Sequence, residues 1–196
     1  MLSNPFQPLY FIGDLIYLFG VYGPSARRFR KGRAARSQSR PLDITLDMLV
    51  FLAWHVLPWI YIFSTWLDFA DYSLPAWAGW TGAAIFASAL VLLWKAYRDL
   101  GQNWSPKIDI VEGQVLVTQG IYGKIRHPIY AGLWLWAVAQ PLLLQNWIAG
   151  FAFPLCFLIL YLVRMPREEN MLQDQFGQEY LDYMDKTGRI IPRLVR

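Results

Sequence analysis

Residues 129–163 form a run of 35 positions without a charged side chain. A membrane-spanning helix needs about 20 apolar residues, and each helical residue adds about 1.5 Å. The run is therefore far too long for one crossing. Because the adjacent polar residues Gln145 and Asn146 lie near its middle, we expect two short helices joined there by a tight hairpin.

Two further uncharged segments are long enough to span a bilayer. They are Met48–Leu67, with 20 residues, and Trp77–Trp94, with 18. Leu9–Gly23 is a weaker candidate because it is short and contains Asp14. The chain is 56% hydrophobic and only 16% charged, whereas soluble domains average about 25% charged residues. We therefore predict an all-α integral membrane protein with five transmembrane helices.

Basic residues predict the orientation. Residues 27–40 hold seven Lys and Arg side chains and no acid, and such loops stay in the cytoplasm. With five spans, the N-terminus lies outside and the C-terminus inside, and all 18 Lys and Arg residues fall on the cytoplasmic side. The loops at Asp68–Asp71 and Gln145–Asn146 fall outside.

The cytoplasmic parts then include residues 95–128 and the tail from Arg164. The stretch "IDIVEGQVLVTQGIY" is rich in β-branched residues around Glu112-Gly113, which favours a short hairpin or extended segment. In the tail, Leu172, Phe176, Tyr180 and Met184 recur every four residues, which predicts an amphipathic helix. We expect one domain, residues 1–196, with scaffold helices in 1–99 and the functional part in 100–196.

Several classes of site are excluded or disfavoured. One cysteine, Cys156, and two histidines make a structural zinc site improbable, and we expect no metal. Glycine-rich nucleotide loops and the common hydrolase motifs are absent, and we expect no nucleic-acid partner. Within the spans, we expect Asp14 near the outer end of the first, and His55 and Pro58 to serve packing and a kink.

Polar side chains from residues 107–130 and 164–169 are expected together at the cytoplasmic edge of the membrane. Because the hairpin leaves and returns on the same side, the cytoplasmic ends of its two helices must be neighbours, so His127 and Tyr130 should face Arg164 and Glu168. The alternative is structural. In it, Arg126 and Arg164 reach lipid phosphates, while Glu168 and Glu169 lie in solvent at the start of a helix. For Arg126 we retain this anchoring role.

Two segments carry a family resemblance. They are "LVTQGIYGKIRHPIYAG", residues 116–132, and "RMPREENMLQDQFGQEYLDYMDKTGRIIP", residues 164–192. Together they resemble the isoprenylcysteine carboxyl methyltransferase family and its prokaryotic relatives through RHPxYxG, the paired Glu residues and FGxEYxxY. The resemblance covers the chain from Gly101 onward. It implies transfer of a methyl group from S-adenosylmethionine to the carboxylate of a prenylated cysteine.

The resemblance also implies site residues. Arg164 falls where the family places its substrate-carboxylate arginine. The implied cofactor contacts are Lys107, Gln114, Val115, Leu116, Val117, Tyr122, His127, Pro128, Ile129, Tyr130 and Glu168. Among these, Glu168 suits an ammonium group, and Tyr122 or Tyr130 suits the sulfonium through cation–π attraction.

Other functions remain open at this stage. A lipid amine N-methyltransferase would share the cofactor site but would need a base such as Glu169 or His127 to deprotonate the amine. An NADPH-dependent membrane reductase of the sterol type and a small non-enzymatic scaffold are further alternatives. A carboxylate acceptor needs no base, because it is already ionised at pH 7. We therefore expect a lipophilic or prenylated carboxylate as substrate, with membrane lipids as the surroundings.

Overall fold

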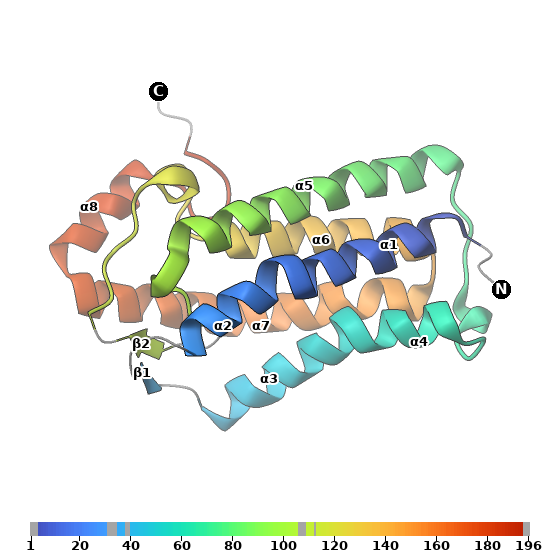
Figure 1. Ribbon diagram of the computed structural model, residues 1–196, viewed down its shortest axis with the longest axis horizontal. Coiled ribbons are helices and arrows are strands. Elements are labelled where there is room, and N and C mark those ends of the chain that lie inside the picture. Colours follow the sequence, from blue (N-terminus) through green and yellow to red (C-terminus); the bar gives the residue numbers. More distant parts are fainter. Residues whose placement is uncertain (1–3, 31–34, 38–39, 106–108, 112, 194–196) are drawn as a thin grey trace.

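Helical segments run side by side along the long axis of the molecule (Figure 1). The structure is a computed structural model that describes residues 4–30, 35–37, 40–105, 109–111 and 113–193. The first segment joins α1 (Phe6–Leu15), the π-helical turn η1 (Ile16–Tyr22) and α2 (Gly23–Arg30). The second joins α3 (Pro41–Phe51), the π-helical turn η2 (Leu52–Val56) and α4 (Leu57–Phe63). The remaining helices are α5 (Ala76–Leu100), α6 (Pro128–Leu144), α7 (Trp147–Phe176) and α8 (Gln178–Lys186).

Short elements complete the described part of the chain. They are the 3-10 turns η3 (Asp68–Ala70), η4 (Gly101–Asn103) and η5 (Gly120–Gly123) and the strands β1 (Ala35–Ser37) and β2 (Asp109–Val111). The two strands pair antiparallel. Of the two alternatives expected around Glu112-Gly113, the extended segment is confirmed by β2, whereas the local hairpin is not formed by β2: it hydrogen-bonds to β1, which supplies its backbone groups with partners. Glu112 lies outside the described residues.

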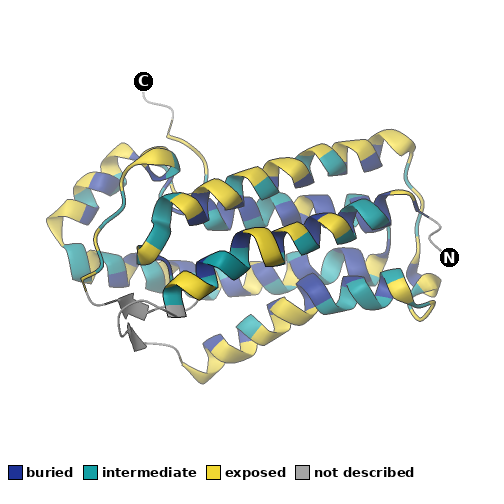
Figure 2. Cartoon of the chain, viewed as in Figure 1, coloured by how far each residue is buried: buried dark blue, intermediate teal, exposed yellow. Residues whose placement is uncertain are grey.

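Three helical stretches are long and apolar enough to cross a membrane. Within the described residues these are Pro41–Phe63, Ala76–Asn103 and Trp147–Phe176. The α6 helix is apolar and has 17 residues, which is about the lower limit for a span. Large apolar side chains such as Phe19, Trp77 and Leu162 are exposed, and exposed positions face outward along the bundle (Figure 2). This surface suits lipid rather than water.

The expected hairpin is present at Gln145 and Asn146. Gln145 adopts a left-handed conformation with φ 52°. The Asn146 side chain then caps α7 by accepting hydrogen bonds from the backbone N–H groups of Ile148 and Ala149. It also donates to Asp71 at 2.8 Å. The two loops expected on one side of the membrane therefore meet at the same end of the bundle.

The second helix of the hairpin is longer than expected. We predicted that it ends near Val163 and is followed by a separate tail, but α7 continues to Phe176 with Pro166 inside it. Ion pairs hold this extension against α3. Arg164 contacts Asp47 at 3.0 Å, and Arg167 contacts Asp43 at 2.5 Å.

The expected single amphipathic helix in the tail is divided in two. Gly177 has φ 54°, a conformation that glycine adopts without steric cost, and the helix breaks there. Leu172 and Phe176 therefore lie on α7, whereas Tyr180 and Met184 lie on α8. The four-residue repeat continues across the break, so sequence periodicity could not detect it.

Asp14 is not near the end of a span. It is fully buried within α1, where His55 and Trp59 form hydrogen bonds to its carboxylate. The expected distortion at Pro58 is present as the turn η2. Because a proline at this position cannot bond to the carbonyl four residues earlier, the Trp54 carbonyl is free to accept a hydrogen bond from the Tyr10 hydroxyl at 2.8 Å.

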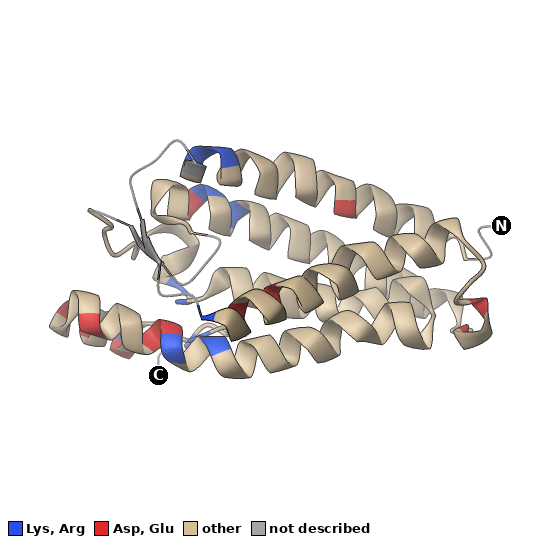
Figure 3. Ribbon diagram, turned by 90° about the horizontal axis from the view of Figure 1, so that it is seen from below, with Lys and Arg blue, Asp and Glu red and all other residues tan. Residues whose placement is uncertain are grey.

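The two ends of the bundle differ in their content of basic residues. Lys and Arg appear in Figure 3 only toward the end that holds α2, α8 and the C-terminal part of α7. The opposite end contains the α4–α5 connection, with Asp68 and Asp71, and the α6–α7 turn. The basic end also holds the cavity described next.

Candidate active site

A cavity of about 490 Å³ opens among the helices at the basic end of the molecule. Its volume lies within the range of about 300–1,000 Å³ that is usual for small-molecule sites. Most of the expected cofactor and substrate residues line it: Gln114, Val115, Leu116, Val117, Tyr122, His127, Ile129, Tyr130, Arg164 and Glu168. Pro128 is buried as the first residue of α6 and is not among the lining residues. Lys107 lies outside the described residues.

His127 is positioned from two directions. Pro128 begins α6, and proline is favoured at a first helical position because its fixed φ suits the helix. On the other side, the backbone N–H groups of Arg126 and His127 donate to the carbonyls of Gly188 and Arg189, at 2.8 and 2.9 Å. We call residues 187–189 the C-terminal clasp, because they hold the loop that presents His127.

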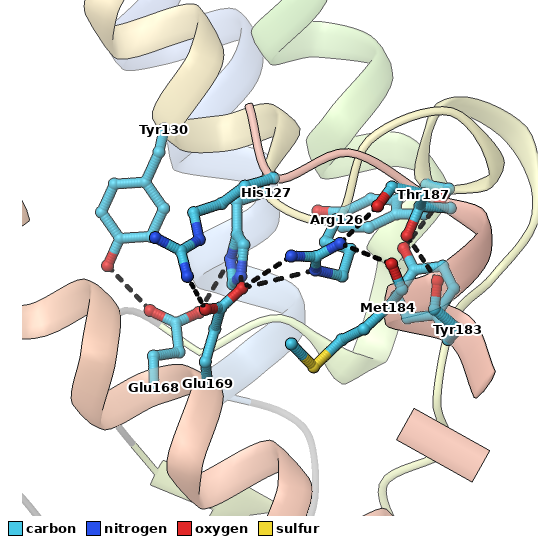
Figure 4. A network of polar contacts seen from close by, with 10 residues as sticks. Arg126, His127, Tyr130, Glu168, Glu169, Tyr183, Met184 and Thr187 are labelled. Carbon is cyan, nitrogen blue, oxygen red and sulfur yellow. Dashed lines mark hydrogen bonds and ion pairs between the residues drawn. The ribbon is translucent and has the colours of Figure 1, made fainter. Parts of the chain in front are cut away.

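Glu168 faces Tyr130 and His127 across the α6–α7 interface, as the topology predicts (Figure 4). The Tyr130 hydroxyl donates to Glu168 Oε2 at 2.7 Å. His127 Nδ1 lies 3.9 Å from Glu168 Oε1. His127 Nε2 lies 3.4 Å from Glu169 Oε1, but it is buried and forms no hydrogen bond within the described part of the chain. This imidazole therefore keeps hydrogen-bonding capacity for a ligand.

Arg164 lies one turn before Glu168 on α7 and lines the same cavity. Its side chain is only 14% exposed, and its Nη1 contacts Asp47 Oδ1 at 3.0 Å. The alternative in which Arg164 reaches lipid phosphates is therefore wrong. A positive and a negative side chain, separated by four residues on one helix face, enter one cavity.

Glu169 joins the cavity wall to the clasp. Its Oε1 accepts hydrogen bonds from Arg126 Nε and Nη2, at 3.3 and 3.2 Å, and its Oε2 accepts one from Arg189 at 2.5 Å. This bond raises the pKa of the Arg189 guanidinium. Arg126 also donates to the carbonyls of Met184 and Thr187, and its side chain is 8% exposed. The anchoring role expected for Arg126 is wrong, because it binds protein groups instead of lipid headgroups.

We expect Glu169→Ala to lower the melting temperature of the purified protein in detergent by several degrees. The substitution leaves the buried Arg126 without its carboxylate, and breaking such a pair costs about 3–5 kcal/mol. A thermal unfolding curve measures the change. Glu179→Ala is the control, since Glu179 is exposed at the start of α8. Equal melting temperatures for the two variants would contradict a structural role for Glu169.

The sequence did not single out some of the residues that line the cavity. Asp47 was missed because it directly precedes the uncharged run. Tyr180 and Tyr183 were part of the quoted FGxEYxxY motif but received no role. The Tyr183 hydroxyl donates to the Tyr122 carbonyl at 2.6 Å, and burial raises the pKa of Tyr122. The Tyr180 hydroxyl is buried in the cavity wall without a hydrogen-bond partner among the described residues.

The cavity can hold two kinds of group. Glu168, the His127 imidazole and the Tyr180 hydroxyl suit a polar ligand that carries a cation. Arg164 suits an anion next to an apolar wall, which Val50, Phe51, Leu133, Phe157 and Leu160 form. Within the described ranges, no group of three or more His, Cys, Asp or Glu side chains could hold a metal ion.

The chain is similar in sequence to proteins of one known family. Residues 80–174 match the model of the isoprenylcysteine carboxyl methyltransferase (ICMT) family. The chain is 30% identical to the protein-S-isoprenylcysteine O-methyltransferase of Tribolium castaneum over 138 residues, which cover 66% of this chain and 49% of the relative. It is 27% identical to the human enzyme of the same name over 164 residues, with 79% and 57% covered.

A solved structure gives an independent comparison. The structure of the eukaryotic intramembrane Ras methyltransferase ICMT superposes with a TM-score of 0.54 at 26% sequence identity. The match covers 76% of this chain and 50% of that one. The chain thus spans about half the length of the curated relatives it matches.

Proposed function

We propose that this integral membrane chain, which is similar to the isoprenylcysteine carboxyl methyltransferase family, methylates a carboxylate on a prenylated or similarly lipophilic acceptor, with S-adenosylmethionine as the methyl donor. One observation carries the proposal. Glu168 and Arg164 line one cavity from successive turns of α7, so a cationic donor and an anionic acceptor can bind side by side. The chain would thereby align the two reacting groups, which is the main requirement of such a transfer.

The residues present fit this donor. S-adenosylmethionine supplies an electrophilic methyl group on a sulfonium. We assign its ammonium to Glu168, which is held by the Tyr130 hydroxyl, and its carboxylate to His127, which lines the same cavity. The sulfonium would lie against Tyr122 or Tyr130, since aromatic faces attract cations. The main-chain groups of Gln114, Val115, Leu116 and Val117 would bind the nucleoside, while Pro128, Ile129 and Lys107 complete the proposed set.

Arg164 would orient the acceptor carboxylate. A guanidinium can hold a carboxylate through two parallel hydrogen bonds, and the contact with Asp47 fixes the side chain before the acceptor arrives. A carboxylate is ionised at pH 7, so the chain needs no general base. Glu169, which would be a candidate base for an amine acceptor, is occupied by Arg126 and Arg189. That occupancy favours the carboxylate acceptor over a lipid amine.

The proposed topology has five spans, an N-terminus outside and a cytoplasmic site. Within the described ranges, Lys and Arg lie toward the cavity end, which supports this topology through the positive-inside rule. We further propose one domain, in which residues 100–196 carry the cofactor contacts and residues 1–99 form the scaffold. Asp47 and Val50 line the cavity from α3, so the scaffold would also contribute to the acceptor side.

Purified protein should transfer label from S-adenosyl-[methyl-³H]methionine to N-acetyl-S-farnesylcysteine. Mild alkali distinguishes the possible products, because a methyl ester releases volatile methanol whereas an N-methyl amine does not. We expect alkali-labile product, and heat-denatured protein is the control. Alkali-stable lipid product would overturn the carboxylate assignment. Tight NADPH binding in calorimetry, with no S-adenosylmethionine binding, would overturn the methyltransferase proposal.

A further inference from the structure

An ionisable pair that the proposed chemistry does not use lies at the deep end of the cavity, with one member in its wall and the other behind it. Asp14 on α1 is fully buried, and His55 on η2 is 4% exposed. Asp14 Oδ1 lies 2.7 Å from His55 Nδ1, and Asp14 Oδ2 accepts a hydrogen bond from Trp59 Nε1 at 2.8 Å. Ionisable groups at membrane depth are costly and usually serve a function.

His55 lines the cavity while Asp14 does not. Because Asp14 occupies Nδ1, only Nε2 remains for a ligand, and it forms no hydrogen bond to a described residue. The ring stacks on Trp54, at 4.5 Å between centroids and 25° between planes. Tyr17 packs beside both rings, with centroids 6.2 Å from His55 and 4.9 Å from Trp54. The imidazole is therefore fixed in orientation before any ligand binds.

Trp54 supplies a second, independent polar atom in the same wall. Its indole lines the cavity and is 8% exposed. Its Nε1 is buried and has no hydrogen-bond partner among the described residues. A buried donor without a partner loses the hydrogen bond it would make in water. Trp54 and His55 thus offer a donor and an imidazole nitrogen to whatever occupies this end of the cavity.

The positions of Asp47 and His55 along their helical segment give the distance between the charged end of the cavity and this polar end. Asp47, which contacts Arg164, lies eight residues before His55 on one continuous helical segment, or on the order of 12 Å along its axis. Apolar residues, including Val50 and Phe51, line the wall between them. The acceptor side of the cavity therefore has a charged end, an apolar middle and a polar end.

We propose that His55 and Trp54 form a subsite for a hydroxyl or carbonyl oxygen in the tail of the lipid acceptor, with Asp14 and Trp59 holding the imidazole in place. The acceptor would then carry an oxygen function on the order of 12 Å from its carboxylate, instead of ending in hydrocarbon. This inference rests on the proposed function, because Arg164 fixes the position of the carboxylate.

The test compares N-acetyl-S-geranylcysteine with its 8-hydroxygeranyl counterpart. Both dissociation constants are measured by calorimetry in detergent, and methyl transfer is measured in parallel. We expect the hydroxylated compound to bind at least about tenfold more tightly, since one hydrogen bond to a buried partner is worth about that factor. Equal binding of the two compounds to the unmodified protein would overturn the subsite.

Three variants test which residues cause the tighter binding of the hydroxylated compound. Trp54→Phe removes the indole N–H, and the double variant Asp14→Leu/His55→Phe removes both members of the buried pair without leaving a charge unpaired. Both should bring the two dissociation constants to within about twofold of each other. Trp134→Phe is the matched control, because Trp134 Nε1 is also buried without a partner among the described residues but Trp134 does not line the cavity. It should keep the full preference.

The outcomes separate this inference from the proposed function. A preference that survives in both Trp54→Phe and the double variant would overturn the subsite, whatever the enzymatic activity. A preference that depends on Trp54 and His55, without transfer of methyl label to either compound, would support the subsite and overturn the methyltransferase proposal.

Discussion

Arg164→Ala is expected to reduce methyl-ester formation by about 10²–10³-fold, the usual loss when a charged or hydrogen-bonding group that positions the reacting centre is removed. The dissociation constant for S-adenosylmethionine should change by less than about threefold. Arg164 contacts Asp47 and lies on the proposed acceptor side of the cavity, so its removal should affect the carboxylate and not the donor. Labelled methyl transfer gives the first quantity, and calorimetry gives the second.

Arg164→Lys is the informative partner variant. Lysine keeps the positive charge but cannot hold a carboxylate through two parallel hydrogen bonds, so activity should fall between that of Arg164→Ala and the unmodified protein. Asp47→Asn should also reduce activity, because it weakens the contact that orients the guanidinium. Full activity in Arg164→Ala would remove this residue from the proposed site.

Glu168→Gln is expected to weaken S-adenosylmethionine binding by about 10–100-fold, because a charge-assisted contact becomes a neutral one. Glutamine has nearly the same shape and can still accept the hydrogen bond from Tyr130, so the fold should be retained. Calorimetry measures the affinity, and a thermal unfolding curve checks the fold. Tyr130→Phe, which leaves the carboxylate in place but removes its donor, should cause a smaller loss.

The two charged residues are thus expected to act on different ligands. An equal loss of S-adenosylmethionine affinity in Arg164→Ala and Glu168→Gln would contradict this division. At saturating donor, Glu168→Gln should recover much of its methyl transfer, whereas Arg164→Ala should not.

The sequence predicts the hairpin and the meeting of His127 and Tyr130 with Glu168, because these follow from topology. A helix pair that turns at Gln145-Asn146 must bring its far ends together, whatever the details of packing. The expected cofactor residues at the ends of this hairpin, His127, Ile129, Tyr130 and Glu168, line the cavity for the same reason. The 114–117 segment, which no periodicity could place, is assigned only by family resemblance.

The partners of Arg126 and Asp14 could not be predicted. Arg126 binds carbonyls near residue 187, and their position depends on the break at Gly177, where the four-residue repeat continues without interruption. Asp14 could be placed inside the bundle only by knowing that His55 and Trp59 face it from another helical segment. Charged residues in an apolar segment have no periodic signal for their partners, so such pairs emerge only from tertiary structure.

The C-terminal clasp has a consequence for how the protein is made. The hydrogen bonds from Arg126 and His127 to Gly188 and Arg189 join a loop to a segment that the ribosome synthesises about 60 residues later, by the printed sequence numbers. During synthesis the helices can enter the membrane one after another, but the loop that presents His127 cannot take its final position until residues 187–189 have emerged. A nascent chain would therefore pass through a fully inserted stage at which the proposed donor site is not yet complete.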